Sequence, residues 1–239
     1  MKHSLAYLTF ALSLAFAVAP FFSGDFAGFA SDMLPNPQIN PPVQPAGYAF
    51  AIWGPIYLWL IASSIYGVMY RKDDADWDAA RLPLCISLAV GVPWLLIAQV
   101  SVIWATITIF IMAGAAIAAL IRSPVQDRWW VRGSIGLYAG WLTAASFVSL
   151  ATTLAGYNIG LDSYGWAITG IIAALTVAIA TYRRVESSTY IVAVVWALVG
   201  ICVANGMANF VVTALAITGI VILLCVMAMQ APRTPRTLS

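Results

Sequence analysis

Eight long apolar runs dominate this sequence and constrain its fold more than any other feature. A helix needs about 20 mostly apolar residues to cross the hydrocarbon core of a bilayer, and each run approaches that length. The composition agrees, because 62% of the 239 residues are hydrophobic and only 8% are charged. We therefore expect an all-α fold, a polytopic integral membrane bundle of about eight transmembrane helices. The runs are residues 5–22, 47–70, 83–100, 102–121, 134–156, 164–182, 189–206 and 209–229.

The positive charges test this count independently, because Lys and Arg collect in cytoplasmic loops. All 11 basic residues fall on one side of an eight-span arrangement, whereas Asp25, Asp32 and Asp162 fall on the other. We therefore predict cytoplasmic N- and C-termini, in a membrane that we take to be a bacterial inner membrane. The net charge of +2 follows from this topology and gives no reason to expect a nucleic acid partner. The basic residues are Lys2, Arg71, Lys72, Arg81, Arg122, Arg128, Arg132, Arg183, Arg184, Arg233 and Arg236.

The first apolar run has two interpretations. Lys2, His3 and the tripeptide at 17–19 resemble a cleavable signal peptide. Pro20 would directly follow that cleavage site, which disfavours cleavage there, although the tripeptide at 15–17 offers a second site. We favour a first helix that is retained.

Residues 23–46 form the longest irregular segment and contain five prolines. This density of proline stiffens a chain toward extended conformations, so the segment either covers the helix ends or simply connects two spans. Tight hairpins are expected near 99–101 and 205–207, where few residues separate the spans. Residues 71–82 have a mixed charge and are interpreted as a solvated turn.

Two prolines lie inside predicted spans. Pro55 and Pro93 should free the carbonyls of Ala51 and Ala89, one turn earlier, and kink both helices. Membrane helices tolerate such kinks, and a bent helix can open a cavity.

Chemically reactive groups are scarce in the apolar runs. No Asp, Glu, Lys or Arg falls inside a predicted span, and His3 is the only histidine. Proton relays and ion-coupled transporters need ionisable groups at membrane depth, and hydrolases need an activated nucleophile with a base. Cys85, Cys202 and Cys225 are interpreted as small buried apolar residues, without disulfide or metal spacing. We therefore expect a protein that is not an enzyme, has no catalytic or metal site and requires no cofactor.

Aromatic residues remain as candidate binding groups, with ten each of Trp, Tyr and Phe. Many suit the membrane interface, and Trp77, Trp129 and Trp130 fit that role. Helical spacing places others on common faces, where small residues either allow close helix packing or leave room for a flat ligand. Residues 138, 141, 145, 149 and 152 form one such face. The candidate ligand-binding residues are Phe50, Trp53, Tyr57, Trp94, Tyr138, Trp141 and Ser149.

Two segments resemble a known family. "PAGYAFAIWGPIYLW" at 45–59 resembles the second-helix signature of the TspO/MBR family, the tryptophan-rich sensory proteins that include the mitochondrial translocator protein. "GLYAGWLTAASFVSLA" at 136–151 resembles the fifth-helix motif of that family. The sequence departs from the family at Gly91 and Ser149, where Asn is usual. The resemblance covers residues 1–157 as a five-helix unit, so residues 158–239 are predicted to add three transmembrane helices and a short cytoplasmic tail.

The resemblance implies binding of flat apolar molecules, such as porphyrins and other tetrapyrroles or sterols, between the five helices and beneath the first loop. The expected role is sensory, regulatory or transport. A porphyrin would stack on Trp and Tyr rings, since no histidine is placed to ligate iron. A structural subunit of a larger membrane complex and a facilitative carrier of an uncharged substrate stay open as alternatives. The expected partners are membrane lipids and a hydrophobic small molecule, with a homodimer or a membrane-complex partner also open.

Overall fold

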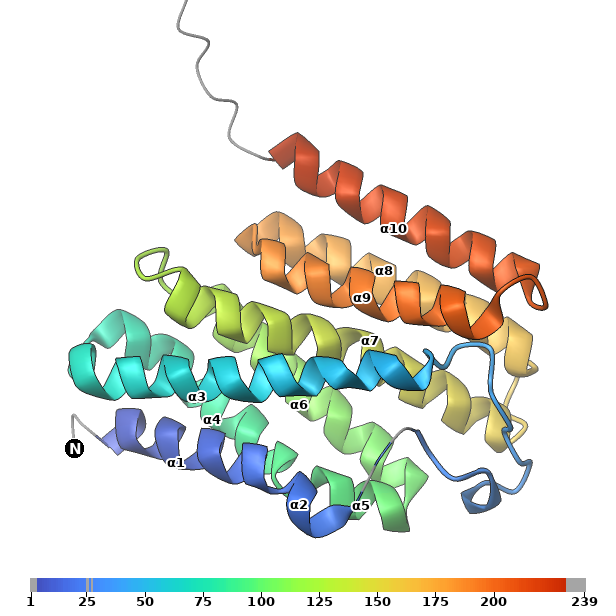
Figure 1. Cartoon of the computed structure of the whole chain (residues 1–239), viewed down its shortest axis with the longest axis horizontal. Coiled ribbons are helices and arrows are strands. Elements are labelled where there is room, and N and C mark those ends of the chain that lie inside the picture. Colours follow the sequence, from blue (N-terminus) through green and yellow to red (C-terminus); the bar gives the residue numbers. More distant parts are fainter. Residues whose placement is uncertain (1–3, 25, 27, 231–239) are drawn as a thin grey trace, which may run out of the picture.

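Every regular element that the structure describes is a helix (Figure 1). The structure is a computed structural model that describes residues 4–24, 26 and 28–230. Within these residues, eight helical spans are long and apolar enough to cross a membrane, which confirms the predicted all-α membrane bundle. The spans are α1 (Ser4–Val18) with α2 (Pro20–Ser23), η2 (Gly47–Ile52) with α3 (Trp53–Tyr70), α4 (Ala75–Gly91) with α5 (Trp94–Val100), α6 (Val102–Arg122), η3 (Trp129–Gly133) with α7 (Ser134–Gly156), α8 (Ser163–Val185), α9 (Ser188–Asn205) and α10 (Phe210–Gln230).

Helix α7 is the centre of the bundle. It packs against α6, α8, α9 and α3, and 18 of its 23 residues are buried. Small residues allow this close packing: a Cβ atom added to Gly140 would lie 2.3 Å from the backbone oxygen of Tyr190 in α9. Lipid tails are as apolar as the helix surfaces, so the hydrophobic effect does not drive helices together in a membrane. Close packing of this kind is therefore a main source of helix association.

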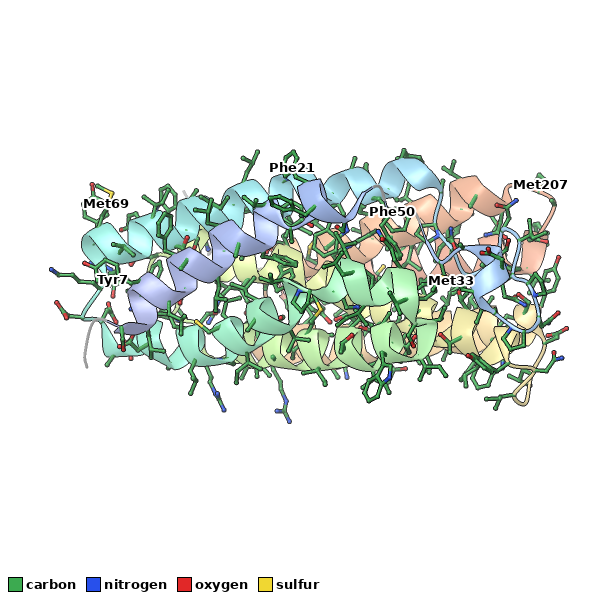
Figure 2. All side chains as sticks on the ribbon, turned by 90° about the horizontal axis from the view of Figure 1, so that it is seen from below. Tyr7, Phe21, Met33, Phe50, Met69 and Met207 are labelled. Atoms are coloured by element: carbon green, nitrogen blue, oxygen red, sulfur yellow. The ribbon has the colours of Figure 1, made fainter. Side chains whose placement is uncertain are left out.

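Large apolar side chains also cover the outside of the bundle (Figure 2). Phe21 is 86% exposed and Met207 is 81% exposed. Such a surface would associate in water, whereas lipid tails are as apolar as these side chains and solvate them. The exterior therefore agrees with an integral membrane protein.

All the described basic residues lie at one end of the bundle, which we call the arginine-rich end. The helices alternate in direction, so this end joins α3 to α4, α6 to α7 and α8 to α9 (Figure 1). Asp32 and Asp162 lie at the opposite end. Lys2, Arg233, Arg236 and Asp25, which belong to the same topology argument, lie outside the described residues.

The predicted turn at 71–82 is mostly helical, which corrects the sequence interpretation. Helix α4 begins at Ala75, because the Asp74 carboxylate caps it by accepting from the backbone N–H groups of Asp76 and Trp77. Acidic residues in the first turn add to this, since they interact favourably with the positive end of the helix dipole.

Arg81 lies in this extension of α4 and is buried. Its guanidinium donates to the carbonyl oxygens of Gly67 (3.0 Å) and Arg71 (2.9 Å), at the C-terminal end of α3. It also pairs with Asp78 at 2.7 Å. The buried cation therefore stabilises a helix C-terminus and is paired with a carboxylate.

An aromatic stack joins the elements of the arginine-rich end. The ring of Tyr66 lies parallel to that of Trp130, with centroids 4.7 Å apart, and stacks on Trp77 at 5.8 Å. Trp77 is only 4% exposed, so its assignment to the membrane interface was wrong. Helical α4 turns this side chain into the bundle, whereas a loop would have left it outside.

The two prolines act differently. Pro93 separates α4 from α5, as predicted, and its carbonyl accepts the N–H of Ile97 at 3.0 Å. Pro55 is the third residue of α3, in the first helical turn, where no intrahelical donor is required. The chain changes from 3-10 to α geometry just before this proline, and the carbonyl of Ala51, which the sequence predicted to be free, accepts the N–H of Trp53.

The proline-rich segment covers the ends of the helices and is not a plain connector. Leu34 and Val43 are buried, and the N–H of Asn36 donates to the carbonyl of Gly156 in α7 at 2.9 Å. Asn205 donates from Nδ2 to the Pro42 carbonyl at 2.8 Å. The expected tight hairpins are also present, with Ser101 alone between α5 and α6.

The ion pair of Arg71 and Asp127 predicts a pH-dependent stability. Arg71 Nε lies 2.7 Å from Asp127 Oδ2 and holds the pKa of that carboxyl below its ordinary value of 3.8. A lowered folded-state pKa stabilises the fold at neutral pH, and this contribution disappears as pH falls through that pKa. Asp127→Asn should therefore lower stability at pH 7 by about 1 kcal/mol, or about 3 °C in Tm.

Thermal unfolding in detergent at several pH values measures this effect. The difference between wild type and Asp127→Asn should shrink once the pH falls below 3.8. Asp32→Asn, at an exposed position of the opposite end, is the control and should leave Tm unchanged. A difference that does not change with pH would contradict the assigned role of the carboxylate.

Candidate functional site

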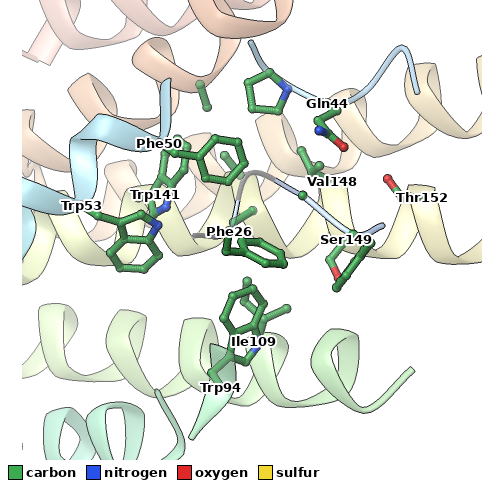
Figure 3. A pocket seen from close by; sticks show the side chains of 16 residues that line it. Phe26, Gln44, Phe50, Trp53, Trp94, Ile109, Trp141, Val148, Ser149 and Thr152 are labelled. Carbon is green, nitrogen blue, oxygen red and sulfur yellow. The ribbon is translucent and has the colours of Figure 1, made fainter. Parts of the chain in front are cut away.

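An apolar cavity lies in the half of the bundle away from the arginine-rich end. Figure 3 shows the side chains that line it. The proline-rich segment covers it, and α3, the junction of α4 with α5, α6, α7 and α9 form its walls. The lining residues are Phe26, Gly28, Phe29, Gln44, Pro45, Phe50, Trp53, Trp94, Ile109, Trp141, Ala144, Ala145, Val148, Ser149, Thr152 and Ala197.

Aromatic rings meet edge to face around this cavity. The Phe26 ring lies 5.2 Å from that of Trp94, and the Phe50 ring lies 5.8 Å from that of Trp141, both nearly perpendicular. Trp53 approaches Trp141 in the same way at 6.2 Å. Each such pair contributes about 1 kcal/mol beyond burial, and together they present ring edges and faces to the cavity.

The structure brings five of the seven predicted site residues to this one cavity: Phe50, Trp53, Trp94, Trp141 and Ser149. The other two do not line it.

Tyr57 stacks behind Trp53, with centroids 5.4 Å apart. Tyr138 is completely buried, and its hydroxyl lies 2.9 Å from Ser87 Oγ. Each tyrosine shares a helix face with a predicted site residue, but each face extends beyond the cavity. Both tyrosines therefore belong to the packed core next to the cavity.

The family usually has Asn at the positions of Gly91 and Ser149, and here both residues make contacts inside the bundle. At Gly91 an added Cβ would lie 2.8 Å from the Phe16 ring and 3.0 Å from Met112, so this glycine makes room for α1 and α6. Ser149 borders the cavity, but its hydroxyl lies 2.7 Å from Thr106 Oγ1. That hydroxyl is therefore already engaged in a bond within the bundle.

Two polar atoms at the cavity have no hydrogen-bond partner. Trp141 Nε1 and Thr152 Oγ1 are both buried without one, whereas Trp94 Nε1 donates to the carbonyl of Ala105 at 3.0 Å. Buried polar groups in proteins nearly always have partners. Ser13 Oγ and Trp77 Nε1, which lie on residues that do not line the cavity, also lack a partner.

Sequence reasoning missed several lining residues. Phe26 and Gln44 lie in the irregular segment, where no periodicity indicates which side chains turn inward. Thr152 shares the helical face of Trp141 and Ser149, so helical spacing predicted its place on that face. Helical spacing gave no sign that its hydroxyl lacks a partner. Ala197 lies in α9, outside the five-helix unit that the resemblance indicated.

Helix α9 holds the end of the covering segment and the adjoining helix η2 in place. Trp196 Nε1 donates to the carbonyl of Ala49 at 2.8 Å, and the Gly200 carbonyl accepts the N–H of Ala46 at 3.0 Å. A Cβ added to Gly200 would lie 2.8 Å from Pro45. One of the three C-terminal spans thus helps to shape the cavity.

The cavity has a volume of about 50 Å³. Sites for drug-sized ligands usually enclose at least 300 Å³, so a large ligand requires the aromatic side chains to move. None of the lining residues named above is ionisable. The described residues also contain no group of three or more His, Cys, Asp or Glu side chains that could hold a metal ion.

The ring of Phe26 occupies space between Trp94 and Phe50 (Figure 3), and this predicts a rescue experiment. Phe26→Ala should enlarge the cavity and destabilise the fold by about 2 kcal/mol. Benzene fills enlarged apolar cavities, so it should raise the Tm of this variant more than that of wild type. Phe21→Ala, on the exposed surface, should show no extra response, and an equal response of Phe26→Ala and wild type would contradict the prediction.

Comparison with known proteins identifies a family for this bundle. Residues 3–229 match the family described as TSPO-like protein, and the match runs through α8, α9 and α10. No curated protein and no solved structure matches the chain. The aromatic cavity, the eight apolar helices and a match over nearly the whole chain lead to one conclusion: this protein belongs to the TSPO-like family.

Proposed function

We propose that this membrane protein binds a flat apolar ligand, of the porphyrin, tetrapyrrole or sterol-like class, in the cavity beneath the proline-rich segment. The observation that carries the proposal is an aromatic cavity that contains two buried polar atoms without partners, Trp141 Nε1 and Thr152 Oγ1. Such a combination of apolar lining and a few polar groups is typical of small-molecule sites.

The role that fits this site is sensory, regulatory or transport, with no catalytic step. No ionisable side chain lines the cavity among the described residues, so the protein would act by holding its ligand. No cofactor is required, although a porphyrin or lipid would be able to occupy the site. Binding would displace the Phe26 ring, because the cavity of about 50 Å³ is smaller than any of these ligands.

The orientation and setting are part of the same proposal. Basic residues mark the cytoplasmic side of membrane proteins, so the arginine-rich end would face the cytoplasm of a bacterial inner membrane and the cavity would lie toward the other side. A ligand would then enter from the extracytoplasmic side or from the lipid. A homodimer or a partner in a membrane complex is compatible with this arrangement.

Titration of the purified protein with protoporphyrin and with the fluorescent sterol dehydroergosterol tests the proposal. Saturable quenching of tryptophan fluorescence is expected, and Trp53→Ala or Trp141→Ala should weaken binding about tenfold through lost ring contacts. Trp129→Ala changes an exposed tryptophan at the arginine-rich end and should leave the affinity unchanged.

Other outcomes favour the two alternatives. A stable stoichiometric partner in native-detergent purification, without ligand binding, would favour a structural subunit. Flux of an uncharged substrate into proteoliposomes, blocked by cavity substitutions, would favour a facilitative carrier. Quenching that is the same in all three variants and in wild type would overturn the proposed site.

A further inference from the structure

The two unpartnered polar atoms of the cavity restrict the chemistry of its ligand, an inference that rests on the proposed function. Trp141 is 2% exposed and Thr152 is 4% exposed, so neither side chain finds a partner in bulk solvent. A buried polar group without a partner costs stability. A site that keeps two such groups at one cavity is arranged to receive hydrogen-bonding atoms there.

Thr152 differs from its neighbours on the same helix. Thr143 Oγ1 donates to the Ala139 carbonyl at 2.8 Å, and Thr153 Oγ1 donates to the Ser149 carbonyl at 2.7 Å. This bond to the carbonyl four residues earlier is the local option open to every helical threonine. Thr152 makes no such bond, so the hydroxyl of this cavity-lining residue is left without a partner.

Trp141 and Thr152 lie on the same face of α7 and toward different ends of the cavity. Eleven residues separate them, which is close to three helical turns and about 16 Å along the axis. Figure 3 shows Val148 and Ser149 between the two. A single ligand that reaches both polar atoms must therefore be elongated, with an apolar middle.

The charge of the ligand follows from the lining. None of the described lining residues carries a charge, so a carboxylate would be buried without a counter-charge, which is strongly unfavourable. An indole N–H and a hydroxyl suit the neutral oxygen of a ketone, alcohol, ester or amide. The lining thus favours uncharged oxygenated ligands over the carboxylate groups of a tetrapyrrole, which would have to stay outside.

We propose that Trp141 and Thr152 are the two ends of a recognition site for an elongated apolar molecule whose buried part is uncharged and carries an oxygen atom near each end. Trp141 donates to one oxygen, and Thr152 bonds to the other. Thr152 thereby becomes a specificity-determining residue that selects ligands with a second oxygen.

A matched series of flat probes tests this directly: biphenyl, 4-acetylbiphenyl, 4,4′-diacetylbiphenyl and biphenyl-4,4′-dicarboxylate. Affinities are measured by isothermal titration calorimetry in detergent. Thr152→Val should weaken binding of 4,4′-diacetylbiphenyl about fivefold, the effect of one lost hydrogen bond. Binding of 4-acetylbiphenyl, which can turn its oxygen to Trp141, should change less than twofold. The dicarboxylate should bind at least about 100-fold more weakly than the diketone.

Further variants separate hydrogen bonding from altered packing. Thr152→Ser keeps the hydroxyl and should retain the affinity for the diketone. Trp141→Phe keeps an aromatic ring but removes the N–H, so it should also weaken diketone binding about fivefold. Thr169→Val changes an exposed threonine of α8 and should alter no affinity. Thermal unfolding of each variant checks that it is folded.

The possible failures are distinguishable. If no compound of the series binds to wild type, the proposed apolar site fails, and the inference fails with it. If the three uncharged compounds bind but Thr152→Val affects none of them selectively, the site stands and two-ended recognition is wrong, with water as the partner of these atoms. Tight binding of the dicarboxylate would overturn the requirement for an uncharged ligand.

Discussion

The close approach of α9 to α7 is the contact on which the rest of the structure depends. Gly136 and Gly140 allow it, because an added Cβ at either position would lie 2.3 Å from an atom of α9 or of the residue before it. Both glycines lie in the segment at 136–151 that resembles the family's fifth-helix motif. With α9 in this position, Gly200 bonds the end of the segment that covers the cavity, and Trp196 bonds the adjoining helix η2.

A second constraint is the satisfaction of polar groups inside lipid. The bilayer core offers no water as a partner, so hydroxyls within the bundle must pair with one another or with backbone carbonyls. The structure shows such pairs between Thr106 and Ser149 at 2.7 Å and between Thr143 and Tyr190 at 2.9 Å. Among the described residues, Thr152 Oγ1 and Trp141 Nε1 at the cavity stay unpaired, as do Ser13 Oγ and Trp77 Nε1 elsewhere in the bundle.

The two ends of the bundle differ in the contacts that hold them together. At the arginine-rich end, Arg81 bonds the end of α3, and Tyr66 stacks between Trp77 and Trp130. Hydrogen bonds, an ion pair and stacked rings fix the helices there. At the other end, the covering segment is held mainly by α9 and contributes the Phe26 ring to the cavity. The arginine-rich end is thus held by direct contacts between helices, and the other end contains the cavity of the proposed site.

The sequence by itself determined the eight spans, their alternation and the charged end, because apolar length and basic residues are constraints that lipid imposes on each segment separately. It also placed Trp53, Trp94 and Trp141 among the site residues through helical spacing. Only the tertiary structure decided that Trp77 is buried, that Tyr138 lies beneath the cavity and that Ala197 lines it. Those outcomes depend on which helices meet and how closely, and packing between distant segments leaves no periodic pattern in the residues that it brings together.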